Sequence, residues 1–236
     1  MSSVPVESVT DLWTCSTEMM GSDMFAGNWN RRHFIAAGLA GCYGLPAIAA
    51  IGKSILVLGD SLSAEYGLTR GTGWVPLLEK RLAAEKIAAT VNNASISGET
   101  TSGGRSHLPV LLQRQKFDVV VLELGANDAL RGLPLGMTED NLSFMTQAAQ
   151  KAGAKVLLVG IQVPPNYGGD YANRFAGIYD KVARKHKAAL VPFMLKGVAD
   201  APDPARLFQS DRIHPTGAAQ PAILENIWPE LKKLVK

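Results

Sequence analysis

Cysteine is nearly absent from this chain of 236 residues, which holds only Cys15 and Cys42. Both precede the first run of residues that predicts a β-strand, so we expect the folded domain to contain no thiol and no disulfide. A cysteine nucleophile and a zinc site built on cysteines are therefore excluded. Positive charge is not concentrated either: the basic residues are scattered and form no stripe of the kind that a nucleic-acid partner requires, so no nucleic acid is expected as a partner.

The N-terminal region lacks an apolar run long enough to predict a membrane anchor, because histidine, glycines and a proline interrupt its most apolar stretch, NRRHFIAAGLAGCYGLPAIAA. The stretch instead has the parts of an export signal: Arg31 and Arg32, then an apolar segment, then small residues at 47–49. The paired arginines favour the twin-arginine type, and a general secretory signal is the alternative. We therefore predict an export signal over 1–49 and a periplasmic or secreted domain over 50–236, with no membrane span in the mature domain.

Two features of the signal have competing interpretations. Cleavage near Ala49 competes with processing at Cys42, because Leu39-Ala40-Gly41-Cys42 resembles a lipoprotein box and would leave the domain anchored by a lipid. The residues before Met24 are polar and unlike the start of a signal, so we expect Met24 to be the true first residue. Removal of residues 1–49 leaves 22 basic and 17 acidic residues, a mildly basic domain.

From Ser54 onward, short apolar runs alternate about five times with segments of helical periodicity. Runs that are apolar nearly throughout are buried on both faces, which favours a parallel sheet with helices on both sides. We therefore predict a single α/β domain, a three-layer α/β/α sandwich around a five-stranded parallel sheet. The expected strands are 54–60, 89–95, 118–125, 154–161 and 188–194, and the expected helices are 73–86, a segment within 105–113, 138–153, 171–187 and 216–235.

Polar residues follow three of the predicted strands and precede the last helix. In a parallel sheet, reacting groups gather beyond the carboxyl ends of the strands, so these segments are expected to meet at one edge. The four segments are Gly59-Asp60-Ser61, the run Asn93 to Gly98, Gly125 to Asp128, and Asp211 to Pro215.

Ser61 is the candidate nucleophile, and a serine hydroxyl needs a neighbouring imidazole to accept its proton and a carboxylate to orient that imidazole. Of the four histidines, only His214 has a carboxylate three residues before it, Asp211. His186 lies in a basic helical segment and is expected to be solvated, and His107 has no acid within a few residues. A capping aspartate at the start of a helix, with an incidental histidine, remains the alternative for Asp211 and His214 taken alone.

Asp60 adjoins Ser61 but is not expected to be its base, because successive side chains of an extended segment point to opposite faces. We expect it instead to hydrogen-bond nearby backbone or the Asn127 loop. The charge of a tetrahedral intermediate needs preset donors. The backbone N–H groups of Ser61 and Gly98 and the side-chain amide of Asn127 are the candidates, although each is an ordinary loop residue when taken alone.

The blocks GDSLSAEYG, NNASISGETTSGG, LELGANDALRG and DRIHP together resemble the four sequence blocks of the GDSL or SGNH hydrolase family, in order and over essentially all of 54–234. Within that family they are most similar to the bacterial periplasmic arylesterases, thioesterases and lysophospholipases. The resemblance implies a flavodoxin-like domain, a catalytic triad of Ser61, His214 and Asp211, and oxyanion donors at Gly98 and Asn127. It implies no metal and no organic cofactor, and the missing Gly-x-Ser-x-Gly motif agrees with it.

These observations predict an exported serine hydrolase that cleaves esters or thioesters through an acyl-enzyme and acts as a monomer. Short to medium acyl chains, lysophospholipids and aryl esters are the expected substrates. The loop 129–136 is a candidate cover for a bound chain, and a carbohydrate O-acetylesterase or an inactive binding protein are the alternatives. Candidates for an acyl groove, for which ordinary packing is the other interpretation, are Leu130, Leu133, Ile161, Val163 and Pro164.

Overall fold

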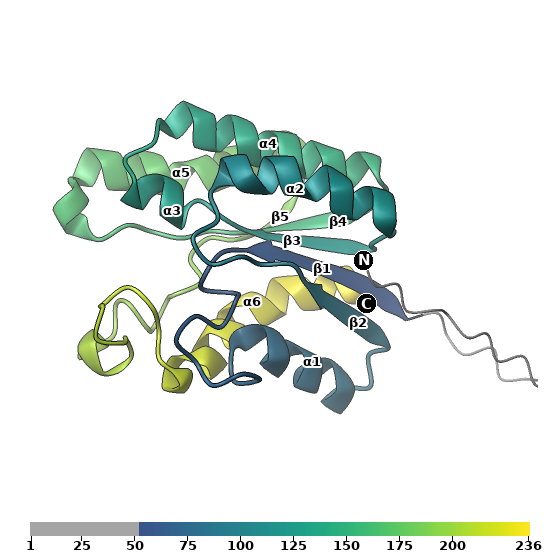
Figure 1. The fold of residues 1–236 in the computed structure, drawn as a ribbon, viewed down its shortest axis with the longest axis horizontal. Helices are drawn as coiled ribbons and strands as arrows, with labels where there is room; N and C mark the ends of the chain where they lie inside the picture. The colour runs from purple at the N-terminus through teal and green to yellow at the C-terminus, as the bar shows by residue number, and fades with distance from the viewer. Residues whose placement is uncertain (1–51) are drawn as a thin grey trace, which may run out of the picture. The chain divides into compact units, whose positions relative to one another are not determined.

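The computed structural model describes residues 52–236, so the predicted export signal lies outside the described residues. One five-stranded sheet runs through the domain in the order β2-β1-β3-β4-β5, and every neighbouring pair is parallel (Figure 1). This is the strand order of a flavodoxin-like sheet, and it confirms the predicted fold class. The strands are β1 (Lys53–Gly59), β2 (Ala89–Asn93), β3 (Val119–Glu123), β4 (Lys155–Val159) and β5 (Ala189–Val191).

Helices cover both faces of the sheet (Figure 1). On one face, α1 (Trp74–Ala84) packs against α6 (Gln220–Val235). On the other face, α2 (Thr101–Arg114) packs against α4 (Leu135–Lys151), which packs against α5 (Gly169–His186). Short helical segments fill the connections: α3 (Ala126–Leu130), η1 (Pro165–Tyr167), η2 (Pro204–Arg206) and η3 (Gly217–Ala219). Among residues 52–236, no helix has the length and apolar character to cross a bilayer.

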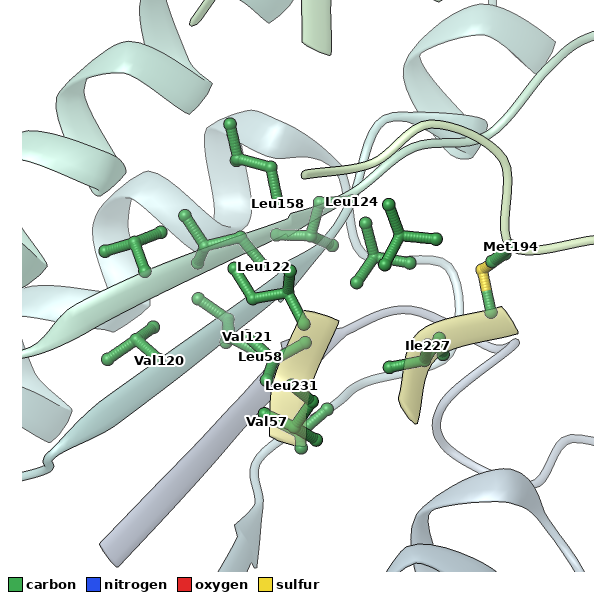
Figure 2. Close-up of a cluster of buried hydrophobic side chains, with 14 of the residues drawn as sticks. Val57, Leu58, Val120, Val121, Leu122, Leu124, Leu158, Met194, Ile227 and Leu231 are labelled. Carbon is green, nitrogen blue, oxygen red and sulfur yellow. The ribbon is translucent and has the colours of Figure 1, made fainter. Parts of the chain in front are cut away.

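The core forms because the central strands carry apolar residues on both faces. All five residues of β3 are buried, and in β1 burial is complete from Ile55 onward. Figure 2 shows Val57 of β1 close to Leu231 of α6, in a buried cluster that also contains Leu122 and Ile227. Each buried methylene contributes roughly 0.8 kcal/mol. The tight packing of the strands therefore fixes the positions at which the chain leaves them, which is where the candidate site lies.

Several predicted boundaries differ from the structure, two of them at helix starts, and one short helix was not expected. The helix expected from Thr138 begins at Leu135, and Thr138 lies inside it with its hydroxyl 3.2 Å from the Oδ1 of Asp128, to which it donates. Helix α2 begins at Thr101, four residues before the expected segment, because the side chain of Thr100 caps it by accepting from the N–H of Gly103. Helix α3 was not expected, since five residues are too few to show a period.

Candidate active site

The nucleophile candidate stands in a tight turn at the end of β1. The carboxylate of Asp60 accepts the N–H of Leu62 at 3.0 Å, and the carbonyl of Asp60 accepts the N–H of Ala64 at 2.9 Å. These two bonds fold the chain back at once, as Asp and Ser favour after a strand. Ser61 is consequently presented at the carboxyl edge of the sheet with its side chain only partly buried.

His214 reaches Ser61 from the far end of the chain. It lies in the connection between β5 and α6, and its Nε2 is 2.9 Å from the Oγ of Ser61. Its Nδ1 is 2.7 Å from the Oδ2 of Asp211. The structure thus brings all three predicted residues into one chain of hydrogen bonds, in the order hydroxyl, imidazole, carboxylate.

Asp211 is fixed by its other oxygen as well. Its Oδ1 accepts the backbone N–H groups of His214 at 3.0 Å and Ile213 at 2.9 Å. The bond from the His214 N–H is the main reason that the pKa of Asp211 is lowered to about 2, with the Ile213 N–H and the His214 ring adding to it. An ionised Asp211 accepts only, so Nδ1 of His214 keeps its proton and Nε2 offers its lone pair to the Ser61 hydroxyl.

Asp60 has the neighbours that the sequence analysis expected, together with one that it missed. Its Oδ2 accepts from the Nδ2 of Asn127 at 3.1 Å, and its side chain is fully buried. Glu123, the last residue of β3, lies beside it: the Oε2 of Glu123 accepts the Ser63 hydroxyl at 2.7 Å. Burial raises the pKa of Asp60 to about 6 and raises the pKa of Glu123 well above its usual range. A buried pair of acids, Asp60 and Glu123, therefore lies beneath the turn of residues 60–67, which we call the nucleophile turn. The sequence feature that could have indicated this pair is a glutamate inside an apolar strand.

The candidate oxyanion donors lie on two neighbouring loops. Gly98 has a φ of 80°, a conformation that favours glycine, and its carbonyl accepts from the guanidinium of Arg131 at 2.8 Å. Among the described residues, no protein acceptor takes the N–H of Ser61 or of Gly98. Asn127 differs, because its Nδ2 donates to Asp60 and, at 3.0 Å, to the carbonyl of Glu99. Its amide must release one of these acceptors to bind a substrate oxygen.

A buried network that the sequence analysis missed ties these two loops together. The carboxylate of Asp128 is fully buried and accepts the backbone N–H of Thr101 at 2.8 Å and the hydroxyls of Thr101 and Thr138. Asn141 completes the network by donating to the Thr101 hydroxyl at 3.1 Å. Asp128 follows Asn127 directly, and Thr101 is three residues after Gly98. This buried network therefore fixes the distance between the loop of Gly98 and the loop of Asn127.

The other two described histidines lie away from Ser61. His186 is half-buried, with its Nε2 2.6 Å from the Oγ of Ser143, so the expectation that it is simply solvated was wrong. His107 is 3.2 Å from a carboxylate oxygen of Glu99, an acid eight residues earlier in the chain. Neither has the serine, imidazole and carboxylate order seen at His214.

A cleft of about 700 Å³ opens beside Ser61 and His214. Four of the five expected groove residues line it, namely Leu130, Ile161, Val163 and Pro164. Leu133 does not line it, because the chain turns at Gly132, where φ is 64°. Much of the remaining lining was not anticipated. It comes from the β5–α6 connection and comprises Leu195, Ala199, Pro204, Ala205, Phe208, Arg212 and Ile213. Within residues 52–236, no group of three or more His, Cys, Asp or Glu side chains is arranged to hold a metal ion.

A serine, a histidine and an aspartate hydrogen-bonded in this order at the carboxyl edge of an α/β sheet are typical of serine hydrolases. The comparisons with known proteins agree with that class. The chain belongs to the GDSL-like lipase/acylhydrolase family, whose model matches residues 57–221, and it is an esterase.

Relatives at substantial identity carry esterase names. Esterase TesA of Pseudomonas aeruginosa is 50% identical over 199 residues, 84% of this chain and 98% of that protein. An arylesterase of Vibrio mimicus is 42% identical over 189 residues, 80% of this chain and 93% of that protein. The crystal structure of TesA superposes with a TM-score of 0.74 at 52% identity, covering 77% of this chain and 99% of that one.

Proposed function

We propose that this esterase cleaves carboxylic esters and thioesters through an acyl-enzyme on Ser61, with His214 as general base and Asp211 as its orienting acid. The observation that carries the proposal is the pair of hydrogen bonds of His214, 2.9 Å to Ser61 and 2.7 Å to Asp211. The first distance lies within the range in which a base takes a proton directly, and the second is that of a charge-assisted hydrogen bond, which orients the imidazole.

In the acylation step, the Oγ of Ser61 attacks the carbonyl carbon while its proton passes to the Nε2 of His214. The charge on the former carbonyl oxygen is met by preset donors, each of which typically contributes about 3–4 kcal/mol. The N–H groups of Ser61 and Gly98 are the first donors, and Asn127 is the third once it releases Asp60 or Glu99. The imidazolium then protonates the leaving oxygen or sulfur, and the carbon–leaving-group bond breaks.

Deacylation repeats the same transfers with water as the nucleophile. His214 takes a proton from water, hydroxide adds to the acyl carbon, and the proton returns to the Oγ of Ser61 as the carboxylic acid leaves. Asp211 remains ionised throughout, since its pKa of about 2 lies far below neutrality. It stabilises each imidazolium without accepting the proton itself.

An acyl chain is the substrate part that the cleft fits best. Aliphatic and aromatic side chains contribute most of the lining, on both the α3 side and the β5–α6 side, and the volume of about 700 Å³ exceeds what an acetyl group fills. We therefore favour short to medium acyl chains, with aryl alcohols, thiols or lysophospholipid headgroups as leaving groups. A carbohydrate O-acetylesterase shares the same machinery, but a sugar would need more polar partners than this lining offers.

We further propose that the enzyme is exported and works as a monomer in the periplasm or outside the cell. The support for export is the sequence of residues 30–50, which lie outside the described structure. The support for a monomer is that one chain supplies every group of the proposed site. Cleavage near Ala49 and lipidation at Cys42 are distinguished by the mass of the mature protein's N-terminal peptide.

The decisive experiment compares wild type with Ser61→Ala on p-nitrophenyl esters of two to twelve carbons. The proposal expects a loss of about 10⁴-fold or more in kcat for every chain length. Acetylated xylose oligomers, assayed beside the esters, test the alternative. Hydrolysis of p-nitrophenyl butyrate by Ser61→Ala at the wild-type rate would rule the proposal out, and preferred turnover of the acetylated sugar would favour the alternative substrate.

A further inference from the structure

His214 is held in a long connection with little regular structure. Residues 192–219, which link β5 to α6, contain only two three-residue helical turns and one isolated bridge, between Phe208 and Pro215. A side chain on such a connection is placed less firmly than one on a strand. The bond to Ser61 requires the imidazole to stay within a few tenths of an ångström, so contacts must fix this connection against the nucleophile turn.

Two residues make those contacts. The ring of Tyr66, in the nucleophile turn, packs on the ring of His214 with their centroids 4.3 Å apart and an angle of 38°. The side-chain amide of Gln209 donates to the carbonyl of Tyr66 at 2.9 Å, and the backbone N–H of Gln209 donates to the carbonyl of His214 at 2.8 Å. Tyr66, His214 and Gln209 therefore form a closed ring of contacts across the two segments.

The same glutamine amide also fixes the residue after the histidine. Its Nε2 lies 3.2 Å from the carbonyl of Pro215, to which it donates, so the one amide group joins both segments. Gly67, beside Tyr66, has a φ of 68°, and a Cβ added there would collide with the Oε1 of Gln209. The missing side chain at Gly67 thus leaves the space that the Gln209 amide occupies.

Tyr66 has little reason to be an aromatic residue other than this contact. Half of its surface is exposed, so its burial contributes little to the core. Its ring does, however, cover one face of the imidazole, and an aromatic ring there restricts the imidazole to the plane that points Nε2 at Ser61. An aromatic face also attracts the imidazolium that forms during each transfer.

We propose that Tyr66 and Gln209, the imidazole clip, are positioning residues that hold the ring of His214 in line with Ser61. The inference rests on the proposed function, since it assigns the clip to the residue that serves there as base. Tyr66 and Gln209 touch the base and its segment and take no proton themselves. Their loss should lower kcat and leave KM largely unchanged, because the acyl cleft is not altered.

The test uses variants that remove one contact each, Tyr66→Leu and Gln209→Leu, with Tyr66→Phe as the conservative variant. We expect kcat for p-nitrophenyl butyrate to fall about 10- to 100-fold in the two leucine variants, as displacement of a catalytic group by about 1 Å does, with KM changed less than about threefold. Tyr66→Phe keeps the ring and is expected to retain kcat within about threefold.

Matched controls come from the same chain. Tyr167→Leu removes a tyrosine at the same edge of the sheet whose ring lies against Tyr171, 6.4 Å away, and not against His214. Gln115→Leu removes an amide that joins distant segments, donating to the Ser54 hydroxyl at 3.0 Å, at the opposite end of the sheet. Both controls are expected to keep wild-type kcat. Equal losses in the controls would overturn the proposal.

A double-mutant cycle with His214→Ala separates positioning from a general structural effect. A residue that acts only through His214 has nothing left to position in this background, so Tyr66→Leu and Gln209→Leu should each change the residual rate by less than about twofold. The full 10- to 100-fold loss on top of His214→Ala would contradict the clip. Labelling of Ser61 by a fluorophosphonate in the wild type tests the proposed function separately, so the two failures are distinguishable.

Discussion

Replacing Asp211 by asparagine is the perturbation that probes the proposed mechanism most finely. Asparagine keeps the side-chain oxygen that accepts the N–H groups of Ile213 and His214, so the local turn is retained. The other oxygen, 2.7 Å from the Nδ1 of His214, becomes an NH₂ group. An NH₂ group favours a lone pair on Nδ1 and a proton on Nε2, and the protonated Nε2 cannot accept the proton of Ser61.

The size of the effect follows from the bonds that change. The variant loses a hydrogen bond to a charged group, worth about 1.5–3 kcal/mol. In the productive tautomer, the NH₂ group of the introduced asparagine and the Nδ1–H group of His214 are two donors that point at each other, which costs roughly 1–3 kcal/mol. Water relieves part of that sum, because the side chains of His214 and Asp211 are 16% and 36% exposed. We therefore expect a net loss of about 3–4 kcal/mol, or roughly 10²- to 10³-fold in kcat/KM at 1.36 kcal/mol per factor of ten.

The assay is steady-state hydrolysis of p-nitrophenyl butyrate at pH 7–8, with thermal unfolding measured on the same samples. Asp203→Asn is the matched control, because Asp203 is an exposed carboxylate of the same connection for which the structure shows no hydrogen bond among the described residues. Its kcat/KM should equal that of the wild type. A loss below tenfold in Asp211→Asn, with unchanged Tm, would refute the assigned role of Asp211.

Three further outcomes are expected. Because Gly98 has a φ of 80°, Gly98→Ala should lose about 1–2 kcal/mol of stability to left-handed backbone strain. The added methyl group beside the oxyanion site should also lower kcat roughly 10²-fold. A folded variant with wild-type kcat would contradict the role of Gly98 as an oxyanion donor. Burial raises the pKa of Asp60 to about 6 and the pKa of Glu123 well above its usual range, so the native state holds protons that the unfolded chain releases. The contribution of this pair to stability therefore falls as pH rises above about 4, where the two groups ionise in the unfolded chain. Glu123→Gln should flatten that fall in Tm against pH, whereas Glu79→Gln, at an exposed carboxylate that makes no ion pair or hydrogen bond among the described residues, should not. Identical slopes for all three proteins would contradict the assignment. Ala199→Trp should lower kcat/KM for p-nitrophenyl octanoate about tenfold more than for the acetate, and equal effects would place the acyl chain elsewhere.

The sheet was predictable because its strands are apolar nearly throughout, a pattern that few other environments produce. Every residue of β3, and every residue of β1 from Ile55 onward, is buried, so each of these positions favours an apolar side chain. The continuous apolar runs in the sequence therefore predict these strands directly. The helix starts were less predictable. Thr138 has the properties of a capping residue, yet its hydroxyl bonds to Asp128, a contact that depends on the tertiary fold.

The candidate site divides in the same way. The triad could be proposed from the sequence because a serine nucleophile needs a histidine base and that histidine needs a carboxylate. A parallel sheet also brings the strand ends that carry Ser61, Asp211 and His214 to one edge. The contacts between Tyr66 and Gln209 depend on the path of the β5–α6 connection, and so does the part of the cleft that Ala199 lines. This connection is irregular, so its path could not be predicted from a periodic pattern in the sequence. The buried Glu123 left a trace, a charge in an apolar run, but its partner could be known only from the packing of β1 beside β3.

The most direct test of the central claim is to label the wild-type enzyme with a fluorophosphonate and identify the modified residue by peptide mass spectrometry. We expect a phosphonyl group on Ser61, no labelling of Ser61→Ala, and labelling slowed at least about 100-fold in His214→Ala, where the proton acceptor is missing. A label on any other residue, or labelling of Ser61 at an unchanged rate without His214, would contradict it.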